Sequence, residues 1–371
     1  MMTTPRTMCS LISMSAILLT LTIAGPATAE VSGLTPGPVE LKSIGPMTFA
    51  EQGVLLVGDP KTASIYALDL SRVGNGQSAP SNVSVDDLQG AIANTLSASA
   101  SDVTIGDLAV DPESRQIVLS ATVGDSVHLL RVDATGIEKI NLDKVAHAKK
   151  DLPNPPADRI QGEGRRRKNL RNESITDLAY FDGRVLVSGL SAGDSPSSVS
   201  EFSFPFADNT IVTNVEIYHA AHGGVEEPAI RAFIPMTING QPTLLAGFTC
   251  TPLVRFPLEQ LEGDRTVRGT TVAELGNRNR PLDLISYRRD GQAYLLMSNT
   301  ARGVMKISTE NIEQAPGLTD KVDGGGTAGQ PFEQVESIED VAQMDKWSDT
   351  QAVAVVGKAD ATQRLITFDL P

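Results

Sequence analysis

A repeated unit of about 50 to 60 residues constrains the fold of this chain more than any other feature. Each unit has an apolar strand, a turn, a second strand that ends in small residues, a loop, and a third strand of alternating polarity. The turns at 182–183, 239–240 and 290–291 are Asp-Gly or Asn-Gly, which tolerate the positive φ of tight hairpins. The pattern therefore predicts short antiparallel strands and almost no helix. The units occupy residues 46–70, 104–133, 174–204, 229–258, 280–308 and 337–370.

A fainter fourth strand follows some of these units, with candidates at 137–142, 209–219 and 266–275. Units of this length with four short strands are typical of β-propeller blades, so we expect an all-β chain folded as a single β-propeller. Six blades are favoured, and a seventh within 134–172 is the alternative. The last unit stops at its third strand. We expect the strand 38–44 to complete that blade and close the ring, because closure removes exposed sheet edges.

Two segments interrupt the repeat and are expected to be surface insertions. Residues 85–100 predict a short helix, because Leu88, Ile92 and Leu96 recur at every fourth position. Residues 143–172 are polar, basic and broken by prolines, which is typical of a mobile surface loop. We therefore expect a propeller domain over 30–371 with these two insertions.

Residues 1–29 predict a signal peptide, with Arg6 before an apolar run at 11–24 and the small residues Ala-Thr-Ala at 27–29. The apolar run is shorter than the roughly 20 residues of a membrane span, and no later stretch is suited to cross a bilayer. We expect export, to the periplasm or the medium. Removal of Arg6 changes the formal charge from −14 to −15, and such acidity disfavours nucleic acid as a partner. Cys250 is then the single cysteine.

The chain resembles the broad β-propeller superfamily of exported bacterial proteins, over nearly all of 30–371. It departs from WD40 repeats, because its one tryptophan, Trp347, is followed by Ser348 rather than aspartate. One tryptophan also cannot supply the repeated motif of quinone-cofactor dehydrogenase propellers. In size it is similar to calcium-dependent lactonase-type propellers, whose ligands are acidic and asparagine side chains around the channel. The resemblance implies the fold and not the activity, since propellers host unrelated functions.

Polar residues at the starts of the units are candidate ligand-binding residues, because the innermost strand of each propeller blade lines the central channel. Aspartates recur at corresponding places, where they either cap turns or offer oxygen ligands to Ca²⁺. Arg280 beside Asn279 is suited to binding a carboxylate. The candidates are Glu226, Glu227, Arg231, Asn279, Arg280, Asp283, Asn299 and Arg302, and the aspartate series is Asp107, Asp177, Asp283 and Asp340.

Two of the four histidines, His219 and His222, lie three residues apart in "YHAAHGGVEEP". They follow a strand-like run and precede two glycines, so a helix is not expected there. The pair predicts either a hydrogen-bonded loop or a Zn²⁺ or Cu²⁺ site with Glu226 or Glu227 as third ligand, and His222 is also a candidate general base. Cys250 is expected to be either a buried inert thiol or a ligand or nucleophile.

Two functions remain open at this point. The first is an exported binding module whose loops, at one mouth of the channel, meet a protein or a small-molecule ligand. The alternative is a metal-assisted enzyme of hydrolase or lyase type with a divalent ion (Ca, Zn or Cu). In that enzyme Arg231, Arg280 or Arg302 would hold a small polar or anionic substrate, while His222 or a carboxylate would move a proton. Convergence of the histidine pair with the polar unit starts favours the enzyme. No Gly-x-Ser-x-Gly elbow, phosphate loop or dinucleotide fingerprint is present.

Overall fold

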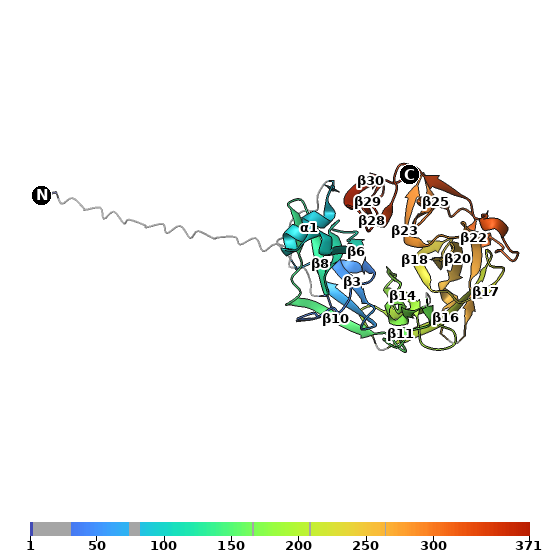
Figure 1. Cartoon of the computed structure of the whole chain (residues 1–371). Coiled ribbons are helices and arrows are strands. Elements are labelled where there is room, and N and C mark those ends of the chain that lie inside the picture. The colour runs from blue at the N-terminus through green and yellow to red at the C-terminus, as the bar shows by residue number, and fades with distance from the viewer. Residues whose placement is uncertain (3–30, 74–81, 165–166, 208, 264) are drawn as a thin grey trace. The chain divides into compact units, whose positions relative to one another are not determined.

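Short apolar strands pair into six antiparallel sheets that form a ring around a central axis (Figure 1). The computed structural model describes residues 1–2, 31–73, 82–164, 167–207, 209–263 and 265–371. The predicted signal peptide lies almost entirely outside these described residues. The expected fold is confirmed, since the chain is an all-β, six-bladed β-propeller. Within the described residues, no helix has both the length and the apolar character needed to span a membrane.

Each blade has four main strands, ordered from the axis to the rim, and the blades are numbered here after the six sequence units. The innermost strands are β2 (Met47–Phe49), β6 (Val103–Val110), β13 (Asp177–Phe181), β18 (Ile230–Ile238), β23 (Pro281–Arg289) and β28 (Val341–Lys346). The second strands are β3 (Val54–Asp59), β7 (Ile117–Val123), β14 (Arg184–Leu190), β19 (Gln241–Phe248), β24 (Gln292–Asn299) and β29 (Gln351–Val356). The third strands are β4 (Ser64–Asp69), β8 (Ser126–Asp133), β15 (Ser197–Ser203), β20 (Pro252–Pro257), β25 (Val304–Ser308) and β30 (Arg364–Asp369). The fourth strands, from blade 1 to blade 6, are β10 (Val145–Asp151), β9 (Gly136–Lys139), β16 (Thr210–His219), β22 (Thr270–Glu274), β27 (Phe332–Val335) and β5 (Ser84–Val85).

Smaller elements extend or connect these sheets. The α-helix of the described residues is α1 (Leu88–Leu96). The extra strands are β1 (Thr35–Gly37), β11 (Ile160–Gln161), β12 (Lys168–Asn169), β17 (Gly224–Glu226), β21 (Val267–Arg268) and β26 (Ala328–Gly329). Single turns of 3₁₀ helix lie at Glu51–Gly53, Ala100–Asp102, Leu170–Glu173, Leu258–Gln260, Ile312–Gln314 and Asp323–Gly325.

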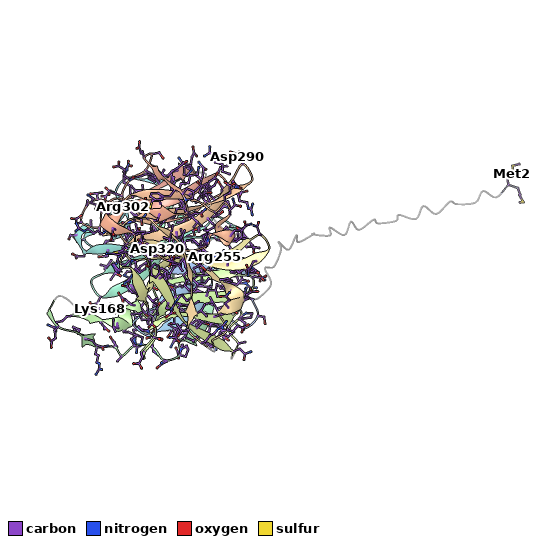
Figure 2. All side chains as sticks on the ribbon, turned by 90° about the vertical axis from the view of Figure 1, so that its right-hand side faces the viewer. Met2, Lys168, Arg255, Asp290, Arg302 and Asp320 are labelled. Carbon is purple, nitrogen blue, oxygen red and sulfur yellow. The ribbon has the colours of Figure 1, made fainter. Side chains whose placement is uncertain are left out.

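The turns between first and second strands have the chemistry that the sequence predicts. Asp182, Asn239 and Asp290 have φ of 50°, 47° and 52°, and the glycine after each also has a positive φ. Two consecutive residues of this kind form the tight hairpin that matches strand twist. Figure 2 views the ring from the side and shows Asp290, in the β23–β24 turn, toward one face and Arg302, in the β24–β25 loop, toward the other. The loops between second and third strands therefore share the face that carries Arg302.

The blades do not follow one another around the ring in chain order. The inner strand β2 of blade 1 lies between β6 of blade 2 and β13 of blade 3, while β6 also contacts β28 of blade 6. Around the axis the order is therefore blade 2, 1, 3, 4, 5, 6 (Figure 1). A hydrophobic core fills each of the six contacts between neighbouring blades.

The prediction that residues 38–44 complete the last blade is wrong. The strand that pairs with β30 is β5, through the register Leu365↔Val85 and Ile366↔Ser84. Residues 38–44 instead lie against blade 1, where Asp59, at the end of β3, accepts hydrogen bonds from the backbone N–H groups of Lys42 and Ser43. The closing strand is only two residues long, so it leaves no pattern of alternating residues in the sequence.

The two expected insertions are built into the ring. The helix expected within 85–100 is present as α1, whose Leu88 and Ile92 are fully buried in the core between blades 2 and 6. The segment 143–172 is not a loop throughout, because it begins with β10, which pairs with β4 and completes blade 1. The prediction of a loop was wrong here because β10 has a polar composition. Most of its residues are partly buried or exposed, so it lacks the regular alternation of apolar and polar residues that indicates a strand.

Candidate metal centre

The histidine pair lies in a β-hairpin at the rim of blade 3. His219 ends β16, and β17 returns beside it, with Ile217 opposite Glu226 and His219 opposite Gly224. The backbone N–H groups of His222 and Gly223 both donate to the carbonyl of His219 at 3.1 and 2.8 Å. A tight turn rather than a helix therefore brings the two imidazoles together, with ring centroids 3.8 Å apart.

One carboxylate holds both imidazoles. Oε2 of Glu226 is 2.8 Å from Nδ1 of His219, and Oε1 is 2.8 Å from Nδ1 of His222. Burial acts to raise the pKa of Glu226, but its bonds to the two histidines outweigh burial and lower it. Burial lowers the pKa of His219, helped by the neighbouring His222 and opposed by Glu226. With Nδ1 of each ring occupied by a carboxylate, Nε2 remains as the free ring nitrogen.

Cys250 joins this pair from the neighbouring blade 4. It lies in the turn between β19 and β20, where Cys250 and Thr251 have φ of 66° and 58°. Positive φ is a strained conformation for these side chains, above all for a β-branched threonine. The turn is held by hydrogen bonds from the N–H of Cys250 to the carbonyl of Asn279 (2.7 Å) and from Oγ1 of Thr251 to the carbonyl of Gly276 (2.5 Å). These hydrogen bonds thus hold the backbone of Cys250 in an unfavourable conformation and fix the position of its thiol.

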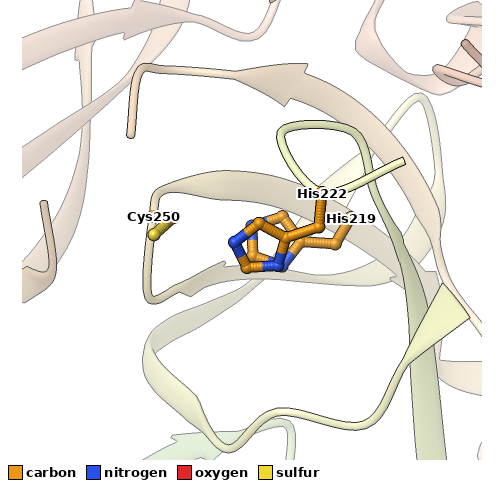
Figure 3. Close-up of side chains that lie close together, drawn as sticks. All are labelled: His219, His222 and Cys250. Carbon is orange, nitrogen blue, oxygen red and sulfur yellow. The ribbon is translucent and has the colours of Figure 1, made fainter. Parts of the chain in front are cut away.

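The three side chains converge. One ligand atom each from His219, His222 and Cys250 can be chosen so that all lie within 4.8 Å of one another. Figure 3 shows the two imidazoles overlapping, one behind the other, with the sulfur of Cys250 toward the edge of the rings. Ligands of one tetrahedral ion with bonds of 2.0 to 2.3 Å are roughly 3.3 to 3.7 Å apart, so a small inward movement would suffice.

The three residues of this cluster differ in their exposure to solvent. His219 is 2% exposed, and its Nε2 is buried without a hydrogen-bond partner in the described part of the chain. A buried ring nitrogen of this kind is uncommon in folded proteins and calls for an explanation. His222, by contrast, has a side chain that is 48% exposed. The cluster therefore has a buried inner ligand and an outer ligand next to solvent.

Glu274 is a functional candidate that the sequence analysis missed. It ends β22, is fully buried, and accepts one hydrogen bond at Oε2 from the N–H of Ala221, between the histidines. Its Oε1 has no hydrogen-bond partner among the described residues. Burial raises the pKa of Glu274 to about 7, against the opposing effects of the Ala221 N–H and of His222. A glutamate in the otherwise apolar run "VAEL" is the sequence signal that could have revealed it.

Other predicted site residues hold the loops of this face. Asn279 and Asn299 are buried and bonded to each other, and Arg302 donates to the carbonyl of Asn277. Arg280 is exposed, and its backbone pairs with Thr300.

Two further predicted residues lie outside the cluster. Glu227 accepts a hydrogen bond from the hydroxyl of Ser195 at 3.1 Å. Arg231 contacts Thr249, which precedes Cys250, through its Nε at 3.2 Å and pairs with Glu173 through its Nη atoms. Arg231 is thereby linked to the cysteine turn and to blade 3, and its guanidinium is already paired.

The repeated aspartates line the central channel, a cavity of about 530 Å³. Each joins two blades: Asp177 accepts from the N–H of Leu178 and of Phe233, and Asp283 accepts from Leu284 and Met344. The fourth member is Asp345, which accepts from the N–H of Val110 on blade 2. Asp340 was therefore the wrong choice; it precedes β28 with φ of 52° and does not line the channel.

Burial in this channel raises the pKa of each carboxyl group, although the bonds from backbone N–H groups oppose the rise. The pKa reaches about 8 for Asp107 and for Asp177 and about 6 for Asp345, and that of Asp283 lies well above its ordinary value. Because every one of the four carboxyl groups bonds to backbone N–H groups of two neighbouring blades, their geometry serves to join inner strands. The candidate site is therefore the cluster of His219, His222 and Cys250 rather than the channel.

Comparison with known proteins finds only distant similarity among solved structures. No protein-family model and no curated protein matches this chain. Extracellular domains 1–2 of Drosophila Semaphorin 1b are similar at 10% identity and a TM-score of 0.42, over 93% of this chain and 88% of that one. The PQQ-bound aldose sugar dehydrogenase of Streptomyces coelicolor is similar at 11% identity and a TM-score of 0.33, over 92% and 99%. The extracellular region of plexin A4 is similar at 10% identity and a TM-score of 0.44; the match covers 88% of this chain but only 39% of plexin A4.

Proposed function

We propose that this propeller binds one transition-metal ion, Zn²⁺ or copper, through His219, His222 and Cys250, and acts on a small ligand at the open position of that ion. The observation that carries the proposal is the convergence of three ligand atoms from two blades beside a buried imidazole nitrogen without a partner.

Export of the protein, predicted from residues 1–29, belongs to the same proposal. N-terminal sequencing of the exported chain should begin at Glu30.

The donor set selects the class of metal. Two imidazoles and a thiolate suit Zn²⁺ and copper, whereas Ca²⁺ and Mg²⁺ prefer oxygen. Glu226 supports the ligands rather than binding the ion, because both its oxygens already accept from Nδ1 of a histidine. Such a carboxylate fixes the tautomer and the orientation of a ligating ring and makes its Nε2 more basic.

The geometry favours a reactive ion over a purely structural one. Structural zinc sites have four protein ligands, whereas catalytic sites have three and leave a position for water or substrate. The described residues place three ligand atoms in this cluster, and the exposed edge of His222 leaves solvent access. An ion there would act as a Lewis acid toward its bound water or ligand. The nearby Glu274, with a pKa of about 7, is suited to hold or release a proton near neutral pH.

Elemental analysis of the tag-free chain tests this proposal. After loading with Zn²⁺ or copper and removal of unbound metal, we expect one ion per chain, lost in His219→Ala and in Cys250→Ser. His128→Ala removes a histidine that lies outside the cluster, on β8, and should retain the ion. A folded protein that holds no stoichiometric metal under any of these conditions would overturn the proposal.

A metal-free binding module is the second candidate. Arg231 favours it, since this residue lines the central channel and its Nε contacts Thr249, beside Cys250. This candidate would gain if the chain bound no metal while a partner or small molecule protected the 249–251 turn from proteolysis.

A further inference from the structure

A pocket of about 630 Å³ adjoins the candidate metal centre. Its walls come from the segments 277–278, 301–302 and 321–325, and from Ala221. Ala221 lies in the turn between the two histidines, and the carbonyl of Ala220 accepts from the N–H of Val322 at 2.9 Å. The pocket and the histidine cluster therefore share a wall.

Three cationic side chains line this pocket: Arg278, Arg302 and Lys321. One acid, Asp323, also lines it, with its Oδ1 3.0 Å from Nζ of Lys321. None of the ion pairs found in the described part of the chain includes Arg278 or Arg302. Acidic groups outnumber basic ones in this protein by 45 to 31, yet two arginines beside one cavity have no acidic partner among the residues that the structure describes. The pocket therefore keeps a positive charge.

Close packing fixes two of these cations. Nε and Nη2 of Arg302 donate to the carbonyl of Asn277 at 3.4 and 3.3 Å, across Gly276, where a Cβ would lie 2.5 Å from Cζ of the arginine. Lys321 covers Gly223, where a Cβ would lie 3.1 Å from its Cδ. The glycines let both long side chains lie flat on the loops of this face. Lys321 thus packs against the same turn that carries His222.

We infer that this pocket binds a doubly charged oxyanion, of which a phosphate group is the simplest. Three cations and one acid leave about two positive charges, and guanidinium groups bind phosphate and carboxylate oxygens in bidentate fashion. The pocket would hold the anionic end of a ligand whose other end reaches the metal centre. That role as a substrate subsite rests on the proposed metal site, whereas binding of the anion does not.

Calorimetric titration of the full chain with inorganic phosphate tests the inference, in metal-free and in metal-loaded protein. We expect saturable binding of one phosphate per chain, weakened at least about tenfold in Arg278→Gln and in Arg302→Gln. Arg364→Gln removes an exposed arginine on β30 and serves as the matched control. Arg278 is exposed, so its replacement tests the pocket without a risk to folding. Succinate is titrated in parallel to ask whether the pocket takes a dicarboxylate instead.

The outcomes separate the two proposals. Phosphate or succinate binding that depends on Arg278 and Arg302, in a chain that holds no metal, would uphold the pocket and overturn the metal centre. A metal-loaded chain that binds neither anion at millimolar concentration would overturn the pocket alone. Binding that both arginine variants leave unchanged would also overturn it. The metal content of these variants should equal that of the wild type, because neither arginine belongs to the histidine cluster.

Discussion

Replacement of Asp177 by asparagine should make the stability of the propeller depend less on pH. The carboxyl group of Asp177 bridges blades 3 and 4, with Oδ1 2.8 Å from the N–H of Leu178 and Oδ2 2.6 Å from that of Phe233. At pH 5 the folded wild type holds this group as a protonated carboxyl, whose hydroxyl oxygen can still accept from the second N–H. Asparagine puts an NH₂ donor in that place, so one buried backbone N–H loses its acceptor, at a cost of about 1–3 kcal/mol in the free energy of unfolding at pH 5.

The sign of the pH effect follows from proton binding in the two states. Burial raises the pKa of Asp177 from an ordinary 3.8 to about 8, so between these values the folded state binds a proton that the unfolded state releases. Stability from this group is fully present below pH 4 and is lost as pH rises toward 8. The slope for one such group is about 1.4 kcal/mol per pH unit, so wild type should lose at most about 2.7 kcal/mol between pH 5 and pH 7 through Asp177. The variant lacks this loss, and its deficit relative to wild type should shrink.

Urea unfolding at pH 5, 6 and 7 measures these quantities, provided that the m-value is unchanged. Asp182→Asn removes the same charge from an exposed hairpin turn and should leave the slope as in wild type. A deficit of Asp177→Asn that stays constant or widens from pH 5 to pH 7 would refute the reasoning.

Two further changes test the metal centre and the ring. Glu226→Gln should weaken metal binding about 10- to 100-fold, because one carboxylate orients both imidazoles. Competition with a chromophoric chelator measures the affinity, and a value equal to that of the control Glu227→Gln would count against this role of Glu226. Leu88→Ala should lower the free energy of unfolding by about 2–5 kcal/mol, since Leu88 is fully buried between blades 2 and 6, and replacement of the partly buried Leu96 by alanine should lower it less. Urea unfolding measures both variants, and a larger loss in Leu96→Ala than in Leu88→Ala would contradict this packing.

Local chemistry made part of the fold predictable. The Asp-Gly and Asn-Gly turns could be identified because positive φ is a property of the residue itself. The order of blades could not, because it depends on two exchanged strands, β5 and β10, that are short or polar. Similarly, the repeat predicted Asp340 as the last member of the aspartate series, whereas the fold puts Asp345 in that place, where it accepts from the N–H of Val110 far away in the sequence.

The sequence predicted only part of the candidate site, because the other part depends on contacts between residues far apart in the chain. His219, His222 and Glu226 lie within eight residues, so their proximity was predictable and their geometry was not. Cys250 reaches them from another blade through a turn with positive φ at two residues that rarely adopt it, which no local rule predicts. Glu274 reaches the histidine turn by the pairing of β22 beside β20, another contact that only the folded ring makes.

X-ray absorption at the edge of the bound metal tests the central claim most directly, because it reports the ligand atoms themselves. For the loaded wild-type chain we predict one sulfur at about 2.3 Å and two imidazole nitrogens at about 2.0–2.1 Å, with the sulfur lost in Cys250→Ser. A spectrum with oxygen and nitrogen neighbours alone, identical in wild type and Cys250→Ser, would contradict a site made by His219, His222 and Cys250.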